Sequence, residues 1–156
     1  MHILLIEDDD EKLRRVQAFV EREYGQVEIS IARSYGSGLR EVIRGKGKIE
    51  LILMDMSMPS FDVTDSEPSG GTPENFAGRD LLAQMKLRSI FTPTIIVTMF
   101  DSFGEKSNKI SLTQLTHELK SQYSPPFHDL VYYDSRQEGW QSALKNSMAK
   151  ILKGIK

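Results

Sequence analysis

The sequence contains no cysteine, and this absence excludes several kinds of protein. A disulfide framework, a zinc site built on thiolates and a thiol nucleophile all require cysteine. The sequence also lacks an excess of basic residues, because 20 Lys and Arg stand against 22 Asp and Glu. Domains that bind nucleic acid usually carry a basic surplus, so the charge balance predicts a protein that does not bind nucleic acid.

Long apolar runs are missing as well. No run approaches the roughly 20 residues that a membrane-spanning helix needs. The first apolar run, Ile3–Ile6, is short and is followed at once by acids, which is not the pattern of a signal peptide. We therefore expect a cytoplasmic protein with no membrane partner. The 156 residues suit one domain, and we expect residues 1–156 to form it with no separate output domain.

Short apolar runs, typical of strands, alternate five times with helical patterns of apolar residues. The predicted strands cover residues 2–6, 27–32, 51–54, 94–98 and 130–133. Alternation of this kind predicts an α/β fold, in which helices cover both faces of a parallel sheet. Residues 56–77 are rich in proline and glycine and are predicted to be a loop.

Acidic residues stand where two of the predicted strands end. Glu7 and Asp8 follow the first strand, and Asp55 follows the third. Ligands of such sheets bind beyond the carboxyl ends of the strands. A cluster of acids there is unfavourable without a cation, and carboxylate oxygens suit Mg²⁺. The alternative is that the acids cap the first helix and face water, which we favour for Asp9, Asp10 and Glu11.

Three segments together resemble the receiver domain of two-component response regulators. They are Leu4–Asp9, Leu53–Pro59 and Pro93–Thr98, each of them at a predicted strand end. The resemblance covers essentially the whole chain. It implies a flavodoxin-like fold, a doubly wound parallel sheet of five strands and five helices.

The resemblance also implies a role for each site residue. Asp55 matches the phosphoacceptor, and Asp8 matches the acid that binds Mg²⁺ directly. Glu7 matches the neighbouring acid that acts on the metal through water. The Ser57 carbonyl matches the backbone ligand of the metal. Thr98 matches the hydroxyl that senses the phosphoryl group.

A receiver of this kind implies a phosphoprotein in a phosphorelay. The phosphoryl group would come from a sensor histidine kinase or a phosphotransfer protein, with Mg²⁺ as the cofactor. The output would be contact with another protein, with a homodimer as one option. We expect no enzyme activity beyond phosphotransfer to the chain itself and autodephosphorylation.

The match to the family fails at one functional position. The family has a lysine at the end of the fifth strand, and here no lysine occurs between Lys120 and Lys145. Arg136 is the cation nearest in sequence to the end of this strand, and it is our first candidate to replace the family's lysine. Lys106 and Lys109, in the loop after the fourth strand, are further candidates. The family also prefers a small residue after the threonine, where this chain has a bulky methionine.

Two segments are longer than is usual in the family. They are residues 60–77, which follow the phosphoacceptor, and residues 99–128, which surround the fourth helix. Tyr132 and Tyr133 are both candidates for the aromatic residue that moves with Thr98.

Two other functions remain alternatives. The first is a receiver-like binding module that works without phosphorylation, favoured by the missing lysine and by Met99. The second is an Mg²⁺-dependent phosphatase with Asp55 as its nucleophile. A haloacid-dehalogenase-like phosphatase would need an aspartate two residues later, where this chain has Ser57.

Overall fold

The fold is built on one parallel sheet of five strands. The computed structural model describes residues 1–64, 70, 73–100, 102–104 and 109–153. In spatial order the strands are β2 (Glu28–Ala32), β1 (His2–Ile6), β3 (Leu51–Met54), β6 (Thr94–Thr98) and β9 (Phe127–Tyr132). The chain first moves from β1 outward to β2 and then returns past β1 to β3. The winding direction therefore reverses between β1 and β3, which is where ligands of such sheets bind.

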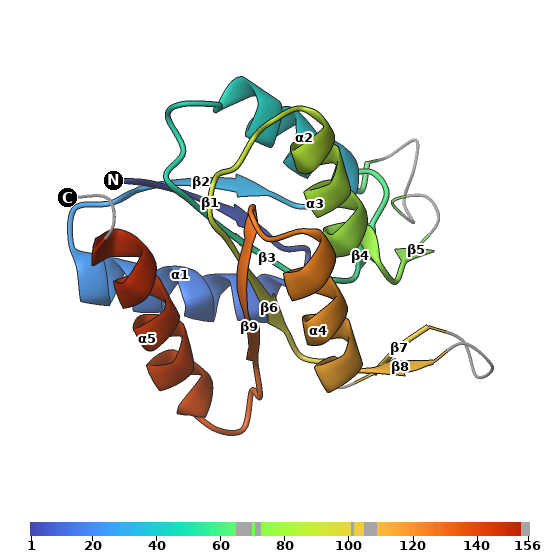
Figure 1. Cartoon of the computed structure of the whole chain (residues 1–156). Helices are drawn as coiled ribbons and strands as arrows, with labels where there is room; N and C mark the ends of the chain where they lie inside the picture. Colours follow the sequence, from blue (N-terminus) through green and yellow to red (C-terminus); the bar gives the residue numbers. More distant parts are fainter. Residues whose placement is uncertain (65–69, 71–72, 101, 105–108, 154–156) are drawn as a thin grey trace.

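Five helices cover the two faces of this sheet. They are α1 (Asp10–Tyr24), α2 (Tyr35–Arg44), α3 (Ala77–Leu87), α4 (Leu112–Gln122) and α5 (Gly139–Lys153). Helices α1 and α5 lie on one face, and α2, α3 and α4 lie on the other (Figure 1). The architecture confirms the predicted flavodoxin-like α/β fold.

Each face of the sheet has its own apolar core, because successive side chains of a strand point to opposite faces. In β1, Ile3 and Leu5 join the core under α1 and α5, whereas Leu4 and Ile6 join the core under α2, α3 and α4. Strand β3 is buried along its whole length. Burial on both faces explains why the central strands read as continuous apolar runs.

Helix α1 begins immediately after the acidic segment. The Asp9 side chain caps it by accepting a hydrogen bond from the Lys12 backbone N–H at 3.1 Å. An aspartate at this position satisfies one of the backbone donors that the first helical turn leaves unpaired. The helix ends at Gly25, as the sequence predicts, with φ at 61°. The cap places Lys12 in the first turn of α1, close to the ends of β1 and β3.

The fifth strand of the sheet differs from its prediction at both ends. It begins at Phe127 rather than at residue 130 and ends at Tyr132. The polar residues His128 and Asp129 made the first half of this strand look like a loop in the sequence. Its register with β6 shifts between Thr94 and Ile95. The Tyr133 N–H still donates to the Thr98 carbonyl at 2.7 Å, so the pairing with β6 continues beyond the assigned strand.

Both of the longer segments contain short antiparallel strands. Strand β4 (Met58–Pro59) pairs with β5 (Pro73–Glu74), which corrects the prediction of an uninterrupted loop over residues 56–77. Strand β7 (Ser102–Phe103) pairs with β8 (Ile110–Ser111), and this hairpin projects beside α4 in Figure 1. Residues 65–69, 71–72, 101 and 105–108 lie outside the described part of the chain.

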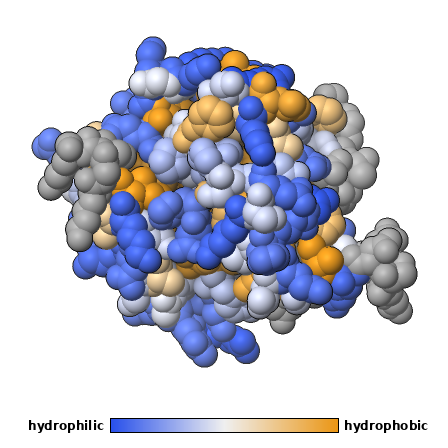
Figure 2. Space-filling model, viewed as in Figure 1, coloured by the Kyte–Doolittle hydropathy of each residue, from blue (hydrophilic) through white to orange (hydrophobic). Residues whose placement is uncertain are grey.

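Polar side chains dominate the face of the molecule in Figure 2, with apolar side chains scattered between them. Among the residues that the structure describes, no helix is long and apolar enough to cross a membrane.

Candidate functional site

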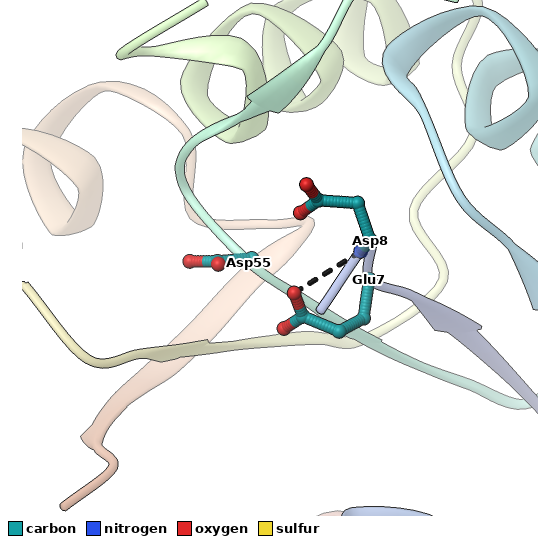
Figure 3. Close-up of side chains that lie close together, drawn as sticks. All are labelled: Glu7, Asp8 and Asp55. Carbon is teal, nitrogen blue, oxygen red and sulfur yellow. Dashed lines mark hydrogen bonds between the residues drawn. The ribbon is translucent and has the colours of Figure 1, made fainter. Parts of the chain in front are cut away.

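Three carboxylates converge where the winding direction of the sheet reverses. Glu7 and Asp8 follow β1, and Asp55 follows β3, which is paired with β1 in parallel register (Ile6 opposite Met54). Each acid offers an oxygen that lies within 4.8 Å of the other two. Figure 3 shows Glu7 and Asp8 after the end of β1, with Asp55 beside them. The structure thus brings together the acids that the sequence singled out.

The acids border a cleft of about 350 Å³ at the carboxyl edge of the sheet. Ser57, Met58 and Pro59 line it on the side of β4, and Met99 and Phe100 line it on the side of β6. Phe100 is 46% exposed, so an apolar side chain stands at the surface beside the acids. Met99, the bulky residue that follows Thr98, thus lies in the wall of this cleft.

Helix α3 packs directly against the backbone of the phosphoacceptor candidate. The Gly78 N–H donates to the Met56 carbonyl at 2.8 Å. A Cβ atom at Gly78 would lie 2.7 Å from the Asp55 carbonyl oxygen and 3.0 Å from the Met56 Cα. Only glycine permits this approach, so Gly78 fixes the position of Asp55 relative to α3.

Asp55 is buried, and both of its carboxylate oxygens have a partner. The side chain is only 3% exposed. One oxygen, Oδ1, accepts a hydrogen bond from the Met56 N–H at 2.6 Å. The other, Oδ2, lies 3.2 Å from the Nζ of Lys12. The carboxylate is therefore held in one orientation at the end of β3.

Lys12 is the residue at this site that the sequence interpretation missed. Its side chain is only 2% exposed. Its Nζ lies 2.6 Å from the Glu7 Oε1 and donates a hydrogen bond to the Val97 carbonyl at 2.5 Å. The available signal was its spacing, because Lys12 stands one turn before Val16 on the apolar face of α1.

Charge pairing and burial shift the pKa values of this group. Burial raises the pKa of Glu7 to about 7, although the positive charge of Lys12 opposes the shift. Burial alone would lower the pKa of Lys12, but the negative charges of Asp55 and Glu7 outweigh it and raise the pKa. Lys12 therefore keeps its proton and its positive charge at neutral pH.

The two adjacent acids after β1 are held differently. Glu7 has its second oxygen, Oε2, bound by the backbone N–H groups of Asp8 and Asp9, each at 3.1 Å. Both oxygens of the Glu7 carboxylate therefore already have partners within the protein. Asp8 is exposed beside the cleft, and burial of part of its side chain raises its pKa. Of the two acids, Asp8 is the one open to a ligand in the cleft.

Two further predicted residues are Ser57, at the cleft, and Thr98, which is bonded to a residue of the cleft wall. Ser57 lines it, and the Ser57 hydroxyl donates to the Asn75 carbonyl at 3.0 Å. Thr98 is fully buried at the end of β6, where its hydroxyl accepts a hydrogen bond from the Phe100 N–H at 3.3 Å. This bond links the hydroxyl to the segment that forms one wall of the cleft.

The structure places Arg136 away from this group of charges. Its side chain is 84% exposed, and its Nε lies 3.2 Å from the Asp134 Oδ1. Among the ion pairs that the structure describes, Asp55 is paired with Lys12 and Arg136 is paired with Asp134. Lys109 is exposed, and Lys106 lies outside the described residues.

The two tyrosines predicted for the fifth strand differ in burial. Tyr132 is 43% exposed, whereas Tyr133 is 1% exposed and packs with Phe19 and Trp140 in the core under α1 and α5. The Tyr133 ring centroid lies 5.9 Å from the Lys12 Nζ. Tyr133 thus stands beneath the ammonium group, and Tyr132 stands at the surface.

Comparison with known proteins gives relatives along nearly the full chain. No family model matches the sequence. The chain is 29% identical, over 97% of its length, to the whole of the Detocs response regulatory protein DtcB of Enterobacter cloacae (strain JD6301). It is 31% identical, over 97% of its length and 99% of the relative's, to the uncharacterized protein y4jR of Sinorhizobium fredii (strain NBRC 101917 / NGR234).

Solved structures share the fold at lower identity. A response regulator receiver domain protein from Clostridium thermocellum has a TM-score of 0.62 at 18% identity, over 96% of this chain and 94% of its own. A response regulator receiver protein from Pseudoalteromonas atlantica has a TM-score of 0.63 at 14% identity, over the whole of both chains. With its acids at the ends of β1 and β3, the chain has the fold of response regulator receiver domains and is similar along nearly its whole length to a response regulatory protein.

Proposed function

We propose that this chain is a phosphoacceptor. It takes a phosphoryl group onto Asp55 from a sensor histidine kinase or a phosphotransfer protein, with Mg²⁺, and signals by contact with another protein. The observation that carries the proposal is the group formed by Glu7, Asp8 and Asp55, whose oxygens lie within 4.8 Å of one another beside an open cleft. A structural role alone would not require three acids in one place.

The chemistry is a displacement at phosphorus. An oxygen of the Asp55 carboxylate attacks the phosphorus atom of the donor and forms an O–P bond. The bond between phosphorus and the donor atom breaks, and its electron pair leaves with the donor. The site contributes mainly by positioning, because phosphoryl transfer depends on alignment and on neutralisation of charge. The hydrogen bond from Met56 and the contact of Gly78 with the Asp55 backbone fix that alignment.

The residues present fit a magnesium ion. Asp8, Asp55 and the Ser57 carbonyl would hold it, and Glu7, whose oxygens contact Lys12 and two backbone N–H groups, would act through water. The ion would supply positive charge to the phosphoryl oxygens. The exposed carboxylate of Asp8 would bind the ion at the cleft, and Asp55 would provide the nucleophile.

The test is the intact mass of the protein after incubation with acetyl phosphate and Mg²⁺. Wild type is expected to gain the mass of one phosphoryl group, released acetate being the other product. Asp55→Asn should gain nothing, and Asp134→Asn, which removes an acid on the neighbouring surface, should behave as wild type. No gain of mass by wild type, with this donor or with purified histidine kinases, would contradict the proposal.

Magnesium binding is a separate expectation. At millimolar Mg²⁺, the backbone amide signals of Glu7, Asp8 and Asp55 are expected to shift in NMR spectra, because the ion changes the charge beside them. Asp8→Asn should abolish most of the change, since it removes a charged ligand. Unchanged signals at all three positions would rule out the metal site.

The alternative is a receiver-like binding module that does not depend on phosphorylation. The ion pair of Lys12 with Asp55 favours it, because the carboxylate already has a counter-ion within the protein. Met99 and Phe100 also favour it, since they occupy one wall of the cleft. The mass measurement separates this function from the first.

A further inference from the structure

Lys12 holds a position that packing alone does not explain. It lies in the first turn of α1, and its ammonium group reaches three acceptors that belong to three strands. They are the Glu7 Oε1 after β1, the Asp55 Oδ2 after β3 and the Val97 carbonyl in β6. A lysine ammonium has three N–H donors, so each donor has one partner. The Nζ atom is therefore held in place from three directions.

Phosphorylation would increase the negative charge at Asp55. A carboxylate carries one negative charge, whereas an attached phosphoryl group carries between about 1.5 and 2 negative charges over three oxygens. Any cation already at the carboxylate is the nearest source of compensation. Replacement of a buried ion pair by apolar residues is often neutral or stabilising, so the presence of this pair does not follow from stability.

We propose that Lys12 is the cation that binds the phosphoryl group on Asp55, an inference that rests on the phosphorylation proposed above. When the O–P bond forms, negative charge moves from the carboxylate to the phosphoryl oxygens. The N–H of Lys12 that points to the Asp55 Oδ2 then turns to a phosphoryl oxygen, and Lys12 remains protonated throughout. Its bonds to Glu7 and to the Val97 carbonyl keep the ammonium group in place.

The surroundings of the lysine suit this role. Its side chain crosses the core under α1, and the ring of Tyr133 lies beneath the ammonium group, with the centroid 5.9 Å from the Nζ. The electron-rich face of an aromatic ring attracts a cation. Tyr133 therefore helps to hold the charged group in place next to Asp55.

Two other cations have acidic partners of their own. Arg136 pairs with Asp134 at the surface, and Arg33 pairs with the exposed Asp10 and donates to the Asp8 carbonyl. Among the ion pairs that the structure describes, Asp55 has Lys12 as its partner. The family's cation at the end of the fifth strand is thus replaced by one from the first helix.

The test compares Lys12→Gln with the matched surface variant Arg136→Gln. The rate of phosphoryl gain from acetyl phosphate is measured at saturating Mg²⁺ by intact mass. Loss of a preorganised donor at a developing charge slows such reactions by about two orders of magnitude, and we expect at least about a tenfold loss in Lys12→Gln. Arg136→Gln should keep the wild-type rate.

The outcomes separate the two proposals. A wild-type or faster rate in Lys12→Gln, or a loss confined to Arg136→Gln, would overturn the role of Lys12 while the phosphoacceptor function stands. A wild type that never gains phosphoryl mass would overturn the function itself, and the role of Lys12 with it.

A second measurement uses the wild-type protein, so it does not depend on the folding of a variant. The protein is labelled with ¹⁵N-lysine and held phosphorylated by excess acetyl phosphate. One lysine Nζ signal is expected to shift and to show coupling to phosphorus across the hydrogen bond. Lys12→Arg, which keeps the charge, should lack that signal. A spectrum in which every Nζ signal is unchanged by phosphorylation would overturn the proposal.

Discussion

Replacement of Gly78 with alanine is expected to lower the free energy of unfolding by about 1–3 kcal/mol, as overpacking in a core does. The added Cβ would lie 2.7 Å from the Asp55 carbonyl oxygen and 3.0 Å from the Met56 Cα. Both are backbone atoms, so no side-chain rotation can relieve the contact. Alanine favours a helix over glycine by roughly 0.5–1 kcal/mol, which offsets only part of the cost. The melting temperature should fall, and the Asp55 segment should be displaced.

Gly139→Ala is the matched control. Gly139 opens α5, and a Cβ atom there would meet nothing within 4 Å. It should leave stability unchanged or raise it slightly. Chemical denaturation gives the free energies, and the backbone amide shifts of Asp55 and Met56 report the displacement. If Gly78→Ala proved as stable as Gly139→Ala, with unchanged shifts, α3 would not be packed on the Asp55 backbone as described.

The central strands could be predicted because burial on both faces leaves a simple pattern. In β3 the run Leu51–Met54 has no polar residue to obscure it. Strand β9 lies at the edge of the sheet, where only two of its six residues are buried, and His128 and Asp129 made its first half look like a loop. Pairing with β6 decided its start, and such pairing is not encoded in the local sequence.

The site was predicted in part for a similar reason. Acids that directly follow adjacent parallel strands must lie close together, so Asp8 and Asp55 could be placed from the strands alone. Lys12 could not, because its partner Val97 is 85 positions away in sequence. A lysine on the apolar face of a helix usually extends its charge to water. Here the N-terminal cap at Asp9 sets the helix so that the side chain points inward to the acids instead.

Removal of the positive charge at Lys12 should have the largest effect on stability. Lys12→Met leaves Glu7 and Asp55 buried without their counter-ion. Removal of one partner of a buried ion pair costs about 3–5 kcal/mol. For a chain of this length, that corresponds to a fall in Tm of roughly 6–20 °C. Lys145→Met is the matched control, because Lys145 pairs with Glu23 at the surface and is 59% exposed. Exposed pairs contribute about 0–1 kcal/mol, so the control should melt near wild type.

Magnesium should restore much of what Lys12→Met loses. With Lys12 gone, none of the three acids has an ion-pair partner among the residues that the structure describes, so Mg²⁺ should bind them more tightly than in wild type. Mg²⁺ at 100 times its Kd would add about 2.7 kcal/mol to the free energy of unfolding. The measurement is Tm in EDTA and in Mg²⁺ for wild type, Lys12→Met and Lys145→Met. Mg²⁺ should raise Tm more in Lys12→Met than in the other two, because Lys12 and the metal compensate the same negative charges. Equal increases of Tm in all three proteins would mean that Lys12 and Mg²⁺ do not compensate the same negative charge. The contact of Lys12 with Asp55 would then contribute by packing alone.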